Sequence, residues 1–341
     1  MTIPATMQAL VQLHDGYTTE PQDQRLSDMS PFVALREVPV PQPGPGQALI
    51  KIARAAANPS DIAFIKGAYG QPRKAGIAAG FEGVGEVVAG DTPLLGKRVS
   101  FFGTGTGTWA EYSLTDAQTL IPLHDAVADR DAAGLIVNPL TAMAMFDIVR
   151  ASGTESFIAT AAGSQLGKFL IQLGAEHGIP CIAAVRRAEQ AAALTEMGAG
   201  AALTITDADF EAEAKRVLGE MKPRIMLDAV GGPASATLFF AMPRKARWIV
   251  YGRLESTPPA LTEIGQFIFL QKQIEGFWLT SWMREEAPER VGAVISEVQQ
   301  RFADGRWSTD VSAEIPLSRA MEEMPAAYSQ PDSKILIAPG G

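Results

Sequence analysis

Residues 156–187 read SFIATAAGSQLGKFLIQLGAEHGIPCIAAVRR and decide the fold. An apolar run leads into a turn of small residues, a pattern with leucines at helical spacing follows, and a second apolar run ends the segment. This order is typical of a strand–turn–helix–strand unit that binds a dinucleotide, with the pyrophosphate at the start of the helix. Only Gly163 and Gly167 of the usual glycine pattern are present, so a plain parallel-sheet crossover remains the alternative.

Two arginines, Arg186 and Arg187, end the second apolar run. A unit that binds NAD usually carries an acidic residue there, which accepts hydrogen bonds from the ribose diol. Two guanidinium groups favour the additional 2′-phosphate of NADP instead, because guanidinium binds phosphate with charge-assisted hydrogen bonds. The sequence therefore predicts NADP(H) as the cofactor.

Length and composition limit the class of protein. The chain has 341 residues, too many for one ordinary core, and its 47% hydrophobic and 20% charged residues describe a soluble globular protein. No apolar run is long enough to span a membrane, and the N-terminus has neither a secretory core nor an Arg-rich transit pattern. A net charge of −9 and a pI near 5.0 argue against nucleic acid as a partner. The single cysteine, Cys181, predicts a reducing, cytoplasmic location.

A metal centre is not expected. The three histidines, His14, His124 and His177, are scattered, and no Cys, His or carboxylate lies at ligand spacing beside them. A zinc site needs three or four such groups together. Each histidine is therefore interpreted as a surface or helix-end residue.

The pattern along the chain predicts two domains of an α/β protein. Residues 1–125 are rich in strand and turn signals, with strands expected at 9–13, 48–53, 83–88, 97–102 and 109–112. A helix is expected over 132–149, followed by strands near 157–160, 181–185, 201–205, 224–228, 247–251 and 273–278 that alternate with helices. That alternation indicates a doubly wound parallel sheet over 126–283. A helix over 289–303 and strands at 311–315 and 334–338 complete the first domain, which thus comprises 1–125 and 284–341.

In this order the chain resembles the zinc-free medium-chain dehydrogenases/reductases over almost its whole length. The resemblance rests on segments 40–46 (VPQPGPG), 58–61 (NPSD), 80–85 (GFEGVG) and 138–142 (NPLTA). Zinc-dependent alcohol dehydrogenases of this superfamily place a Cys ligand where Asn58 stands and a His where Phe81 stands, and the four-cysteine lobe is missing here. The resemblance implies a Rossmann domain that binds NADP and a GroES-like, β-rich catalytic domain.

Two groups of zinc-free members compete, the quinone oxidoreductases and the mitochondrial-type 2-enoyl thioester reductases. Segments 57–62, 65–70, 161–167, 185–186, 267–269 and 276–282 are similar to the second group. Gly163 and Phe81 depart from that group, where Asn is usual at both positions. The resemblance implies an NADPH-dependent reductase of an activated double bond in an enoyl thioester or enone. The alternatives are an NADPH:quinone oxidoreductase and a non-catalytic NADPH-binding protein.

The same resemblance assigns two catalytic residues. Tyr69 is the candidate acid that protonates the enolate, because a phenol is neutral at pH 7 and can donate a proton. Asn58 is placed near the substrate oxygen. The alternatives are that Tyr69 only lines the cleft, and that Asn58, like Asn138, caps a turn before proline.

The remaining assignments concern the cofactor. Asn138 is expected near the nicotinamide ribose or amide, Phe277 to Leu279 beside the nicotinamide ring, and Lys334 at the 2′-phosphate, with an exposed strand-edge lysine as the alternative for Lys334. The full predicted set is Asn138, Thr141, Gly163, Ser164, Gln165, Leu166, Gly167, Arg186, Arg187, Tyr251, Gly252, Phe277, Trp278, Leu279 and Lys334.

The segment Ile274–Trp282 is apolar and aromatic, and it includes the last strand expected in the nucleotide domain. Such a strand would leave an exposed sheet edge unless another chain covered it. We therefore expect a homodimer joined edge to edge through this strand, which is also the dimer contact that the resemblance implies.

Overall fold

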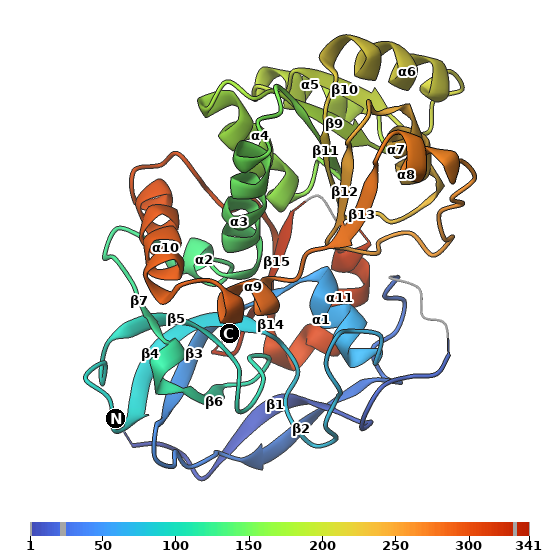
Figure 1. Cartoon of the computed structure of the whole chain (residues 1–341). Coiled ribbons are helices and arrows are strands. Elements are labelled where there is room, and N and C mark those ends of the chain that lie inside the picture. Colours follow the sequence, from blue (N-terminus) through green and yellow to red (C-terminus); the bar gives the residue numbers. More distant parts are fainter. Residues whose placement is uncertain (1, 21–24, 330–332, 341) are drawn as a thin grey trace. The chain divides into compact units, whose positions relative to one another are not determined.

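The structure is a computed structural model that describes residues 2–20, 25–329 and 333–340 (Figure 1). The chain forms two compact units: unit 1 comprises Met1–Val137 and Ser296–Gly341, and unit 2 comprises Asn138–Ile295. The sequence pattern placed these transitions near 125 and 283. Each transition lies at or inside a helix, α3 (Val137–Ala151) and α10 (Pro288–Ala303), so no turn signal marks it in the sequence.

Unit 2 contains a parallel sheet of six strands in the order β10-β9-β8-β11-β12-β13, which confirms the predicted doubly wound class. Its strands are β8 (Phe157–Thr160), β9 (Cys181–Val185), β10 (Ala201–Thr204), β11 (Ile225–Asp228), β12 (Arg247–Val250) and β13 (Gln273–Gly276). The helices between and after them are α4 (Gln165–Glu176), α5 (Glu189–Glu196), α6 (Phe210–Met221), α7 (Pro233–Ala241), α8 (Gly265–Phe269) and α9 (Leu279–Glu285).

Neighbouring residues of β8 show how helices cover both faces of this sheet. Ile158 belongs to the core that α6 and α7 form on one face. The ring of Phe157, the preceding residue, lies 5.9 Å from Phe146 of α3. Because successive strand residues point to opposite faces, α3 packs on the other side. Buried on both faces, the strands read as continuous apolar runs, which is why the sequence located them well.

Unit 1 is built on two sheets. β1 (Thr6–Gln12) and β2 (Val33–Pro39) form an antiparallel pair, and a second sheet has the order β14-β15-β3-β4-β5-β7, with β6 also paired to β3. Its strands are β3 (Gln47–Ala57), β4 (Glu82–Gly90), β5 (Arg98–Phe102), β6 (Tyr112–Asp116), β7 (Ile121–Pro122), β14 (Val311–Pro316) and β15 (Lys334–Ala338). The last two strands belong to this sheet, since β14 pairs with β15 and β15 pairs with β3.

Short helices complete unit 1, where two expectations are wrong and one strand was not expected. The helices are α1 (Pro59–Ile65), η1 (Ala117–Thr119), α2 (Asp129–Ala132), η2 (Leu317–Arg319) and α11 (Ala320–Tyr328). The helix expected over 132–149 is interrupted, because α2 ends at Ala132 and α3 begins at Val137. The strand expected at 109–112 begins only at Tyr112, because Trp109 is buried in a loop. The strand β2 was not predicted.

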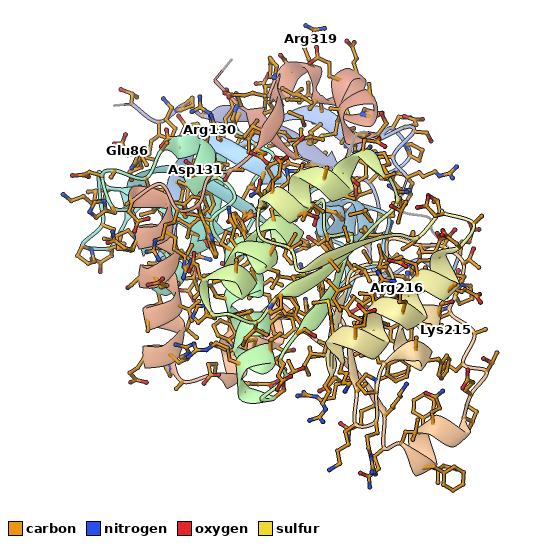
Figure 2. All side chains as sticks on the ribbon, turned by 90° about the horizontal axis from the view of Figure 1, so that it is seen from above. Glu86, Arg130, Asp131, Lys215, Arg216 and Arg319 are labelled. Atoms are coloured by element: carbon orange, nitrogen blue, oxygen red, sulfur yellow. The ribbon has the colours of Figure 1, made fainter. Side chains whose placement is uncertain are left out.

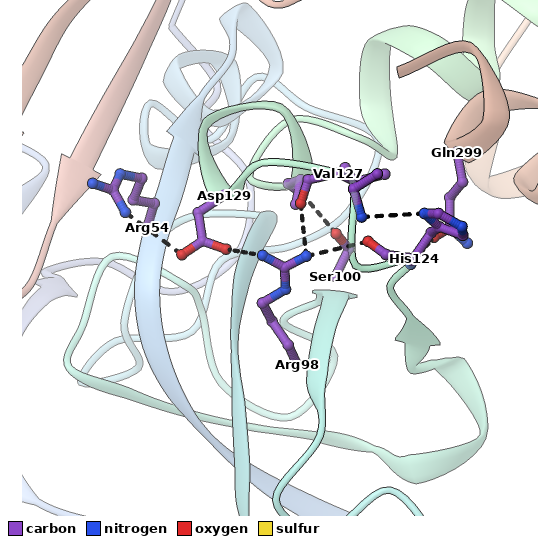
Figure 3. Close-up of polar contacts among 9 residues, drawn as sticks. Arg54, Arg98, Ser100, His124, Val127, Asp129 and Gln299 are labelled. Carbon is purple, nitrogen blue, oxygen red and sulfur yellow. Dashed lines mark hydrogen bonds and ion pairs between the residues drawn. The ribbon is translucent and has the colours of Figure 1, made fainter. Parts of the chain in front are cut away.

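The segment that leads to α3 is held by polar contacts to the sheet of unit 1 (Figure 3). The Arg98 guanidinium donates to the Asp129 carboxylate (3.0 Å) and to the carbonyl oxygens of His124 (3.2 Å) and Val127 (2.6 Å). Arg54 also approaches Asp129, at 3.7 Å. These bonds fix the course of the chain between β7 and α2.

The helix α2, whose Arg130 and Asp131 are labelled in Figure 2, also bonds to the segment after α10. Arg130 donates to the Thr309 carbonyl oxygen at 2.6 Å, and the Asp131 carboxylate accepts from the Thr309 N–H at 2.7 Å. The two segments of the sequence that form unit 1 thus meet at α2. Within the described part of the chain, no helix combines the length and the apolar character needed to cross a membrane.

Candidate functional site

The turn between β8 and α4 has the shape of a phosphate-binding turn. Ala161 adopts a left-handed conformation (φ 47°), and Ser164 caps α4 by accepting a hydrogen bond from the Gly167 N–H at 3.2 Å. A Cβ on Gly167 would lie 2.5 Å from the Ala162 carbonyl oxygen, so only glycine permits this close approach. The predicted residues Gly163, Ser164, Gln165, Leu166 and Gly167 therefore come together at the first turn of a twelve-residue helix. The N–H groups of such a turn lack intrahelical acceptors and attract anions.

A buried carboxylate that the sequence did not reveal joins the residues at the carboxyl ends of these strands by hydrogen bonds. Asp228, the last residue of β11, accepts hydrogen bonds from the Thr160 hydroxyl (2.5 Å) and the Trp248 indole N–H (2.7 Å). It also accepts from the Val230 and Gly231 N–H groups and from the Ser235 hydroxyl. The signal in the sequence is an aspartate at the end of an apolar strand, followed by two glycines.

Arg186 and Arg187 follow β9, whose carboxyl end lies beside that of β8. Both are exposed, and Arg187 forms an ion pair with Glu189 at 3.4 Å. The Arg186 guanidinium makes no hydrogen bond or ion pair with any described residue. Next to them, the Gln190 amide lies over the phosphate turn, since a Cβ on Gly163 would be 2.4 Å from its Nε2. Gln190 gave no signal in the sequence.

Tyr251 and Gly252 follow β12, at the same edge of the sheet. The Tyr251 N–H donates to the Asp228 carbonyl oxygen at 2.9 Å, and a Cβ on Gly252 would lie 2.6 Å from the Ala229 carbonyl oxygen. The Tyr251 hydroxyl is buried and has no hydrogen-bond partner among the described residues. Burial also raises the pKa of Tyr251.

These features fit a dinucleotide with a 2′-phosphate. The glycine-dependent turn at the start of α4 suits a pyrophosphate, and the Arg186 guanidinium suits the additional phosphate. The orphaned hydroxyl of Tyr251 can donate to a further polar group of the ligand.

Two other predicted groups lie in unit 2 near its ends in the sequence. Asn138 and Thr141 are three residues apart in the first turn of α3, so their side chains share a face of the helix. Phe277 and Trp278 are half-buried and follow the edge strand β13, and the Phe277 N–H donates to the Val250 carbonyl oxygen at 2.9 Å. Leu279 is buried and begins α9.

In unit 1, Tyr69 belongs to an aromatic cluster. Its ring lies 5.1 Å from that of Phe81 and 6.4 Å from that of Phe64, and these two rings are 4.9 Å apart. Phe64 is buried, whereas Tyr69 and Phe81 are half-buried. Such tilted contacts restrict the orientation of the Tyr69 ring.

Asn58 and Lys334 take positions that differ from the expectation. Both are buried in unit 1, where the Lys334 ammonium donates to Asn58 Oδ1 at 2.5 Å and lies 3.7 Å from Glu82 Oε1. The Asn58 amide in turn donates to Glu82 Oε1 at 2.9 Å. The reason is strand pairing: Ile335 of β15 lies opposite Ala57 of β3, which puts Lys334 beside Asn58. The alternative of an exposed strand-edge lysine is therefore wrong for Lys334, whose ammonium is engaged within unit 1, and the Asn58 side chain is occupied by protein partners on both sides.

A second carboxylate, Asp61, belongs to the same buried cluster. One of its oxygens accepts from the Asn58 N–H at 2.7 Å, and the other has no partner among the described residues. Burial and, to a smaller extent, the charge of Glu82 raise the pKa of Asp61 to about 7, although the bond from Asn58 opposes this shift. Burial lowers the pKa of Lys334 against the opposing effect of the two carboxylates.

The described residues contain no group of three or more His, Cys, Asp or Glu side chains arranged to hold a metal ion. Phe81 and Asn58, at the positions where zinc-dependent relatives place ligands, make the aromatic and polar contacts given above.

Comparisons with known proteins agree with this architecture. A model of the alcohol dehydrogenase GroES-like domain matches residues 44–125, and a model of the zinc-binding dehydrogenases matches residues 166–297. The mitochondrial enoyl-acyl-carrier-protein reductase of Bos taurus is 28% identical over 323 residues, which cover 92% of this chain and 83% of that relative.

Two solved structures extend the comparison. A protein from Mesorhizobium loti, to which NADPH:quinone reductase activity is ascribed, is 50% identical with a TM-score of 0.96, over 99% of this chain and 100% of the other. The mitochondrial 2-enoyl thioester reductase heterodimer of Candida tropicalis is 21% identical with a TM-score of 0.79, over 98% and 99% of the two chains, which is a likeness of fold. The chain belongs to the medium-chain dehydrogenase/reductase superfamily.

Proposed function

We propose that this protein is an NADPH-dependent reductase that transfers hydride to an activated double bond of a conjugated carbonyl compound. The observation that carries the proposal is the glycine-dependent turn at the start of α4, with an Arg186 guanidinium at the neighbouring strand end that has no partner among the described residues. A 28% identical enoyl reductase and a 50% identical relative with an ascribed NADPH:quinone reductase activity support it.

Each unit has its own part in the proposed reaction. The bound cofactor supplies the hydride from its nicotinamide ring. In unit 2, the first turn of α4 binds the pyrophosphate, Arg186 binds the 2′-phosphate with Arg187 assisting, and Asn138 and Thr141 orient the nicotinamide half. Phe277, Trp278 and Leu279 flank the ring.

Tyr69 of unit 1 is the proposed proton donor. Hydride addition to the β-carbon leaves an enolate that needs a proton at the α-carbon, and the neutral phenol of Tyr69 can supply it. The packing of its ring against Phe81 and Phe64 supports a fixed orientation of the hydroxyl.

A quinone is the second candidate acceptor, and the 50% identical relative favours it. A quinone accepts the same hydride but can take its proton from water, so the two candidates differ in their need for Tyr69. A protein that binds NADPH without turnover is the third candidate.

The deciding experiment follows NADPH and NADH oxidation with crotonyl-CoA, an enone and 1,4-quinones. We expect turnover of crotonyl-CoA or the enone with a preference for NADPH. Turnover of quinones alone would replace the first candidate by the second. NADPH binding without any turnover would leave only the third.

We further propose that the protein is a homodimer joined through β13. This strand is the edge of the unit 2 sheet, and Ile274 in it is 38% exposed. Ile264, Ile268 and Phe269, in or beside the neighbouring α8, are 57%, 67% and 77% exposed. A sheet edge that has several exposed apolar side chains in and beside it is usually covered by another chain. Light scattering at micromolar concentration tests this, and a monomer would refute it. A cytoplasmic location stays a prediction that rests on the single buried Cys181.

A further inference from the structure

The helix α3 begins without a capping residue of its own. The residue before Val137 is Ile136, which is apolar and cannot accept a hydrogen bond with its side chain. The first N–H groups of a helix have no intrahelical partner, and burial makes an unpaired N–H costly. Ile136 is 1% exposed. The helix therefore needs an acceptor from elsewhere in the chain.

Glu82 supplies that acceptor from the start of β4. Its Oε2 accepts hydrogen bonds from the Ile136 N–H at 3.0 Å and the Val137 N–H at 2.8 Å. The carboxylate is fully buried. A carboxylate at a helix N-terminus also interacts favourably with the helix dipole, and here it bonds directly to the N–H groups.

The other oxygen of Glu82 is held by the two residues whose positions differed from expectation. Oε1 accepts from the Asn58 amide and faces the Lys334 ammonium, which itself donates to Asn58 Oδ1. The three residues come from adjoining strand ends, since β15, β3 and β4 are neighbours in the sheet. Gly134 closes the arrangement, because a Cβ there would lie 3.1 Å from Lys334 Cε. Each oxygen of the Glu82 carboxylate thus has its own partners, and together they hold the carboxylate in one position.

We propose that Glu82 is a positioning residue for the nicotinamide half of the cofactor. It acts through the backbone of residues 136 and 137, whose N–H groups it holds, and sets the first turn of α3, which carries Asn138 and Thr141. Asn58 and Lys334 serve this role by fixing the carboxylate. The inference rests on the proposed function, in which Asn138 and Thr141 contact that half of NADPH.

The test compares two ligands in Glu82→Gln and in the control Glu86→Gln. Glu86 lies on the same strand and is exposed (Figure 2). The affinity for NADPH and for 2′,5′-ADP, which lacks the nicotinamide half, is measured by calorimetry. In Glu82→Gln we expect NADPH to bind about ten-fold more weakly or worse, because a charged acceptor of two hydrogen bonds is lost. Binding of 2′,5′-ADP should stay within two-fold, and Glu86→Gln should match the wild type for both ligands.

A second variant and a second measurement cover a failure of Glu82→Gln to fold. Glu82→Asp keeps the charge but withdraws it by one methylene group, so the same split between the ligands is expected in weaker form. Hydrogen exchange of a peptide that contains residues 136 and 137 should be faster in both Glu82 variants.

Three results would overturn the inference. These are unchanged NADPH affinity in both Glu82 variants, an equal loss of both ligands, or unchanged exchange at 136 and 137. A wild-type protein that binds neither ligand would instead refute the proposed function, and the inference with it. Ligand binding by the wild type thus distinguishes a failure of the proposed function from a failure of the inference alone.

Discussion

Each unit contains a fully buried aspartate, and the two carboxylates differ in how many hydrogen bonds they accept. Asp228 of unit 2 accepts hydrogen bonds from five donors, two of them backbone N–H groups of the loop that follows it. Asp61 of unit 1 accepts one bond on one oxygen, and its other oxygen has no partner among the described residues. One carboxylate thus has partners on both oxygens, whereas the other lacks one and has a pKa raised to about 7, mainly by burial.

The difference corresponds to the work proposed for each unit. A buried carboxylate with a full set of donors gives its loop a single shape, which suits a turn that binds phosphates. A buried group whose protonation changes near neutral pH suits a region that transfers protons. We therefore expect variants in unit 1 to change chemistry or pH dependence, and variants in unit 2 to change structure or cofactor affinity.

The largest effect is expected from Tyr69→Phe in unit 1. The variant keeps the ring and its contacts with Phe81 but removes the proton, so kcat with crotonyl-CoA should fall by about 10²–10⁴-fold. NADPH affinity, measured by fluorescence titration, should not change. Quinone reduction should lose much less. Near-normal turnover of every acceptor would show that Tyr69 is not the proton donor.

Next in size is the loss of stability in Asp228→Ala. Five donors lose their acceptor, three of them buried and two part-buried, so the free energy of unfolding should fall by about 3 kcal/mol or more. The isosteric variant Asp61→Asn keeps an oxygen for the Asn58 N–H and should cost less than about 1 kcal/mol at pH 7. Urea unfolding compares them, and equal losses would break the contrast between the two aspartates.

Arg186→Ala is expected to change affinity without changing stability. Its guanidinium bonds to no described residue, so the free energy of unfolding should stay the same. A charge-assisted bond to phosphate contributes roughly 1.5–3 kcal/mol, so NADPH should bind about ten- to hundred-fold more weakly while NADH is unaffected. Equal weakening of both cofactors would contradict the assignment of the 2′-phosphate.

The smallest effects concern the pH dependence of stability, and their signs differ between the units. Asp61 has a folded pKa of about 7, above its usual 3.8, so its contribution to stability falls as pH rises from about 4 to 7. Lys272 of unit 2 is buried and donates to the Phe239 and Phe240 carbonyl oxygens, and burial lowers its pKa to about 8. Its contribution rises as pH increases from about 8 to 10.5.

Unfolding measured across pH separates these two groups. Asp61→Asn should remove the decline between pH 4 and 7 and leave the alkaline region unchanged. Lys272→Met should remove the rise above pH 8 only. A wild-type decline that persists in Asp61→Asn would show that another group titrates there.

The two units also differ in how much the sequence reveals. In unit 2, strands at 157–160 and 181–185 match the prediction because buried parallel strands are unbroken apolar runs bounded by turns. The phosphate turn is contiguous, so its residues could be predicted together. In unit 1, the contact between Asn58 and Lys334 joins residues 276 positions apart, and no local pattern specifies that pairing.

The interruption of the helix near residue 134 also depends on a contact between residues that are distant in the sequence. Residues 132–149 are mostly small or apolar, which favours one helix, although Gly134 and Pro139 are poor residues for a helix interior. The acceptor that holds the second helix start is Glu82, 54 residues before Ile136. Asp228 was missed for a related reason, since its five donors come from three strands or the turns after them and from α7.

The place of β15 in its sheet determines the order in which the units can be completed during synthesis. The strand lies between β14 and β3 and is made of residues 334–338, whereas unit 2 already ends at residue 295. A ribosome therefore releases everything that unit 2 needs while the edge of β3 in unit 1 still awaits its neighbour. The nascent chain can fold its central segment first, and the unit that begins the sequence is the last to close.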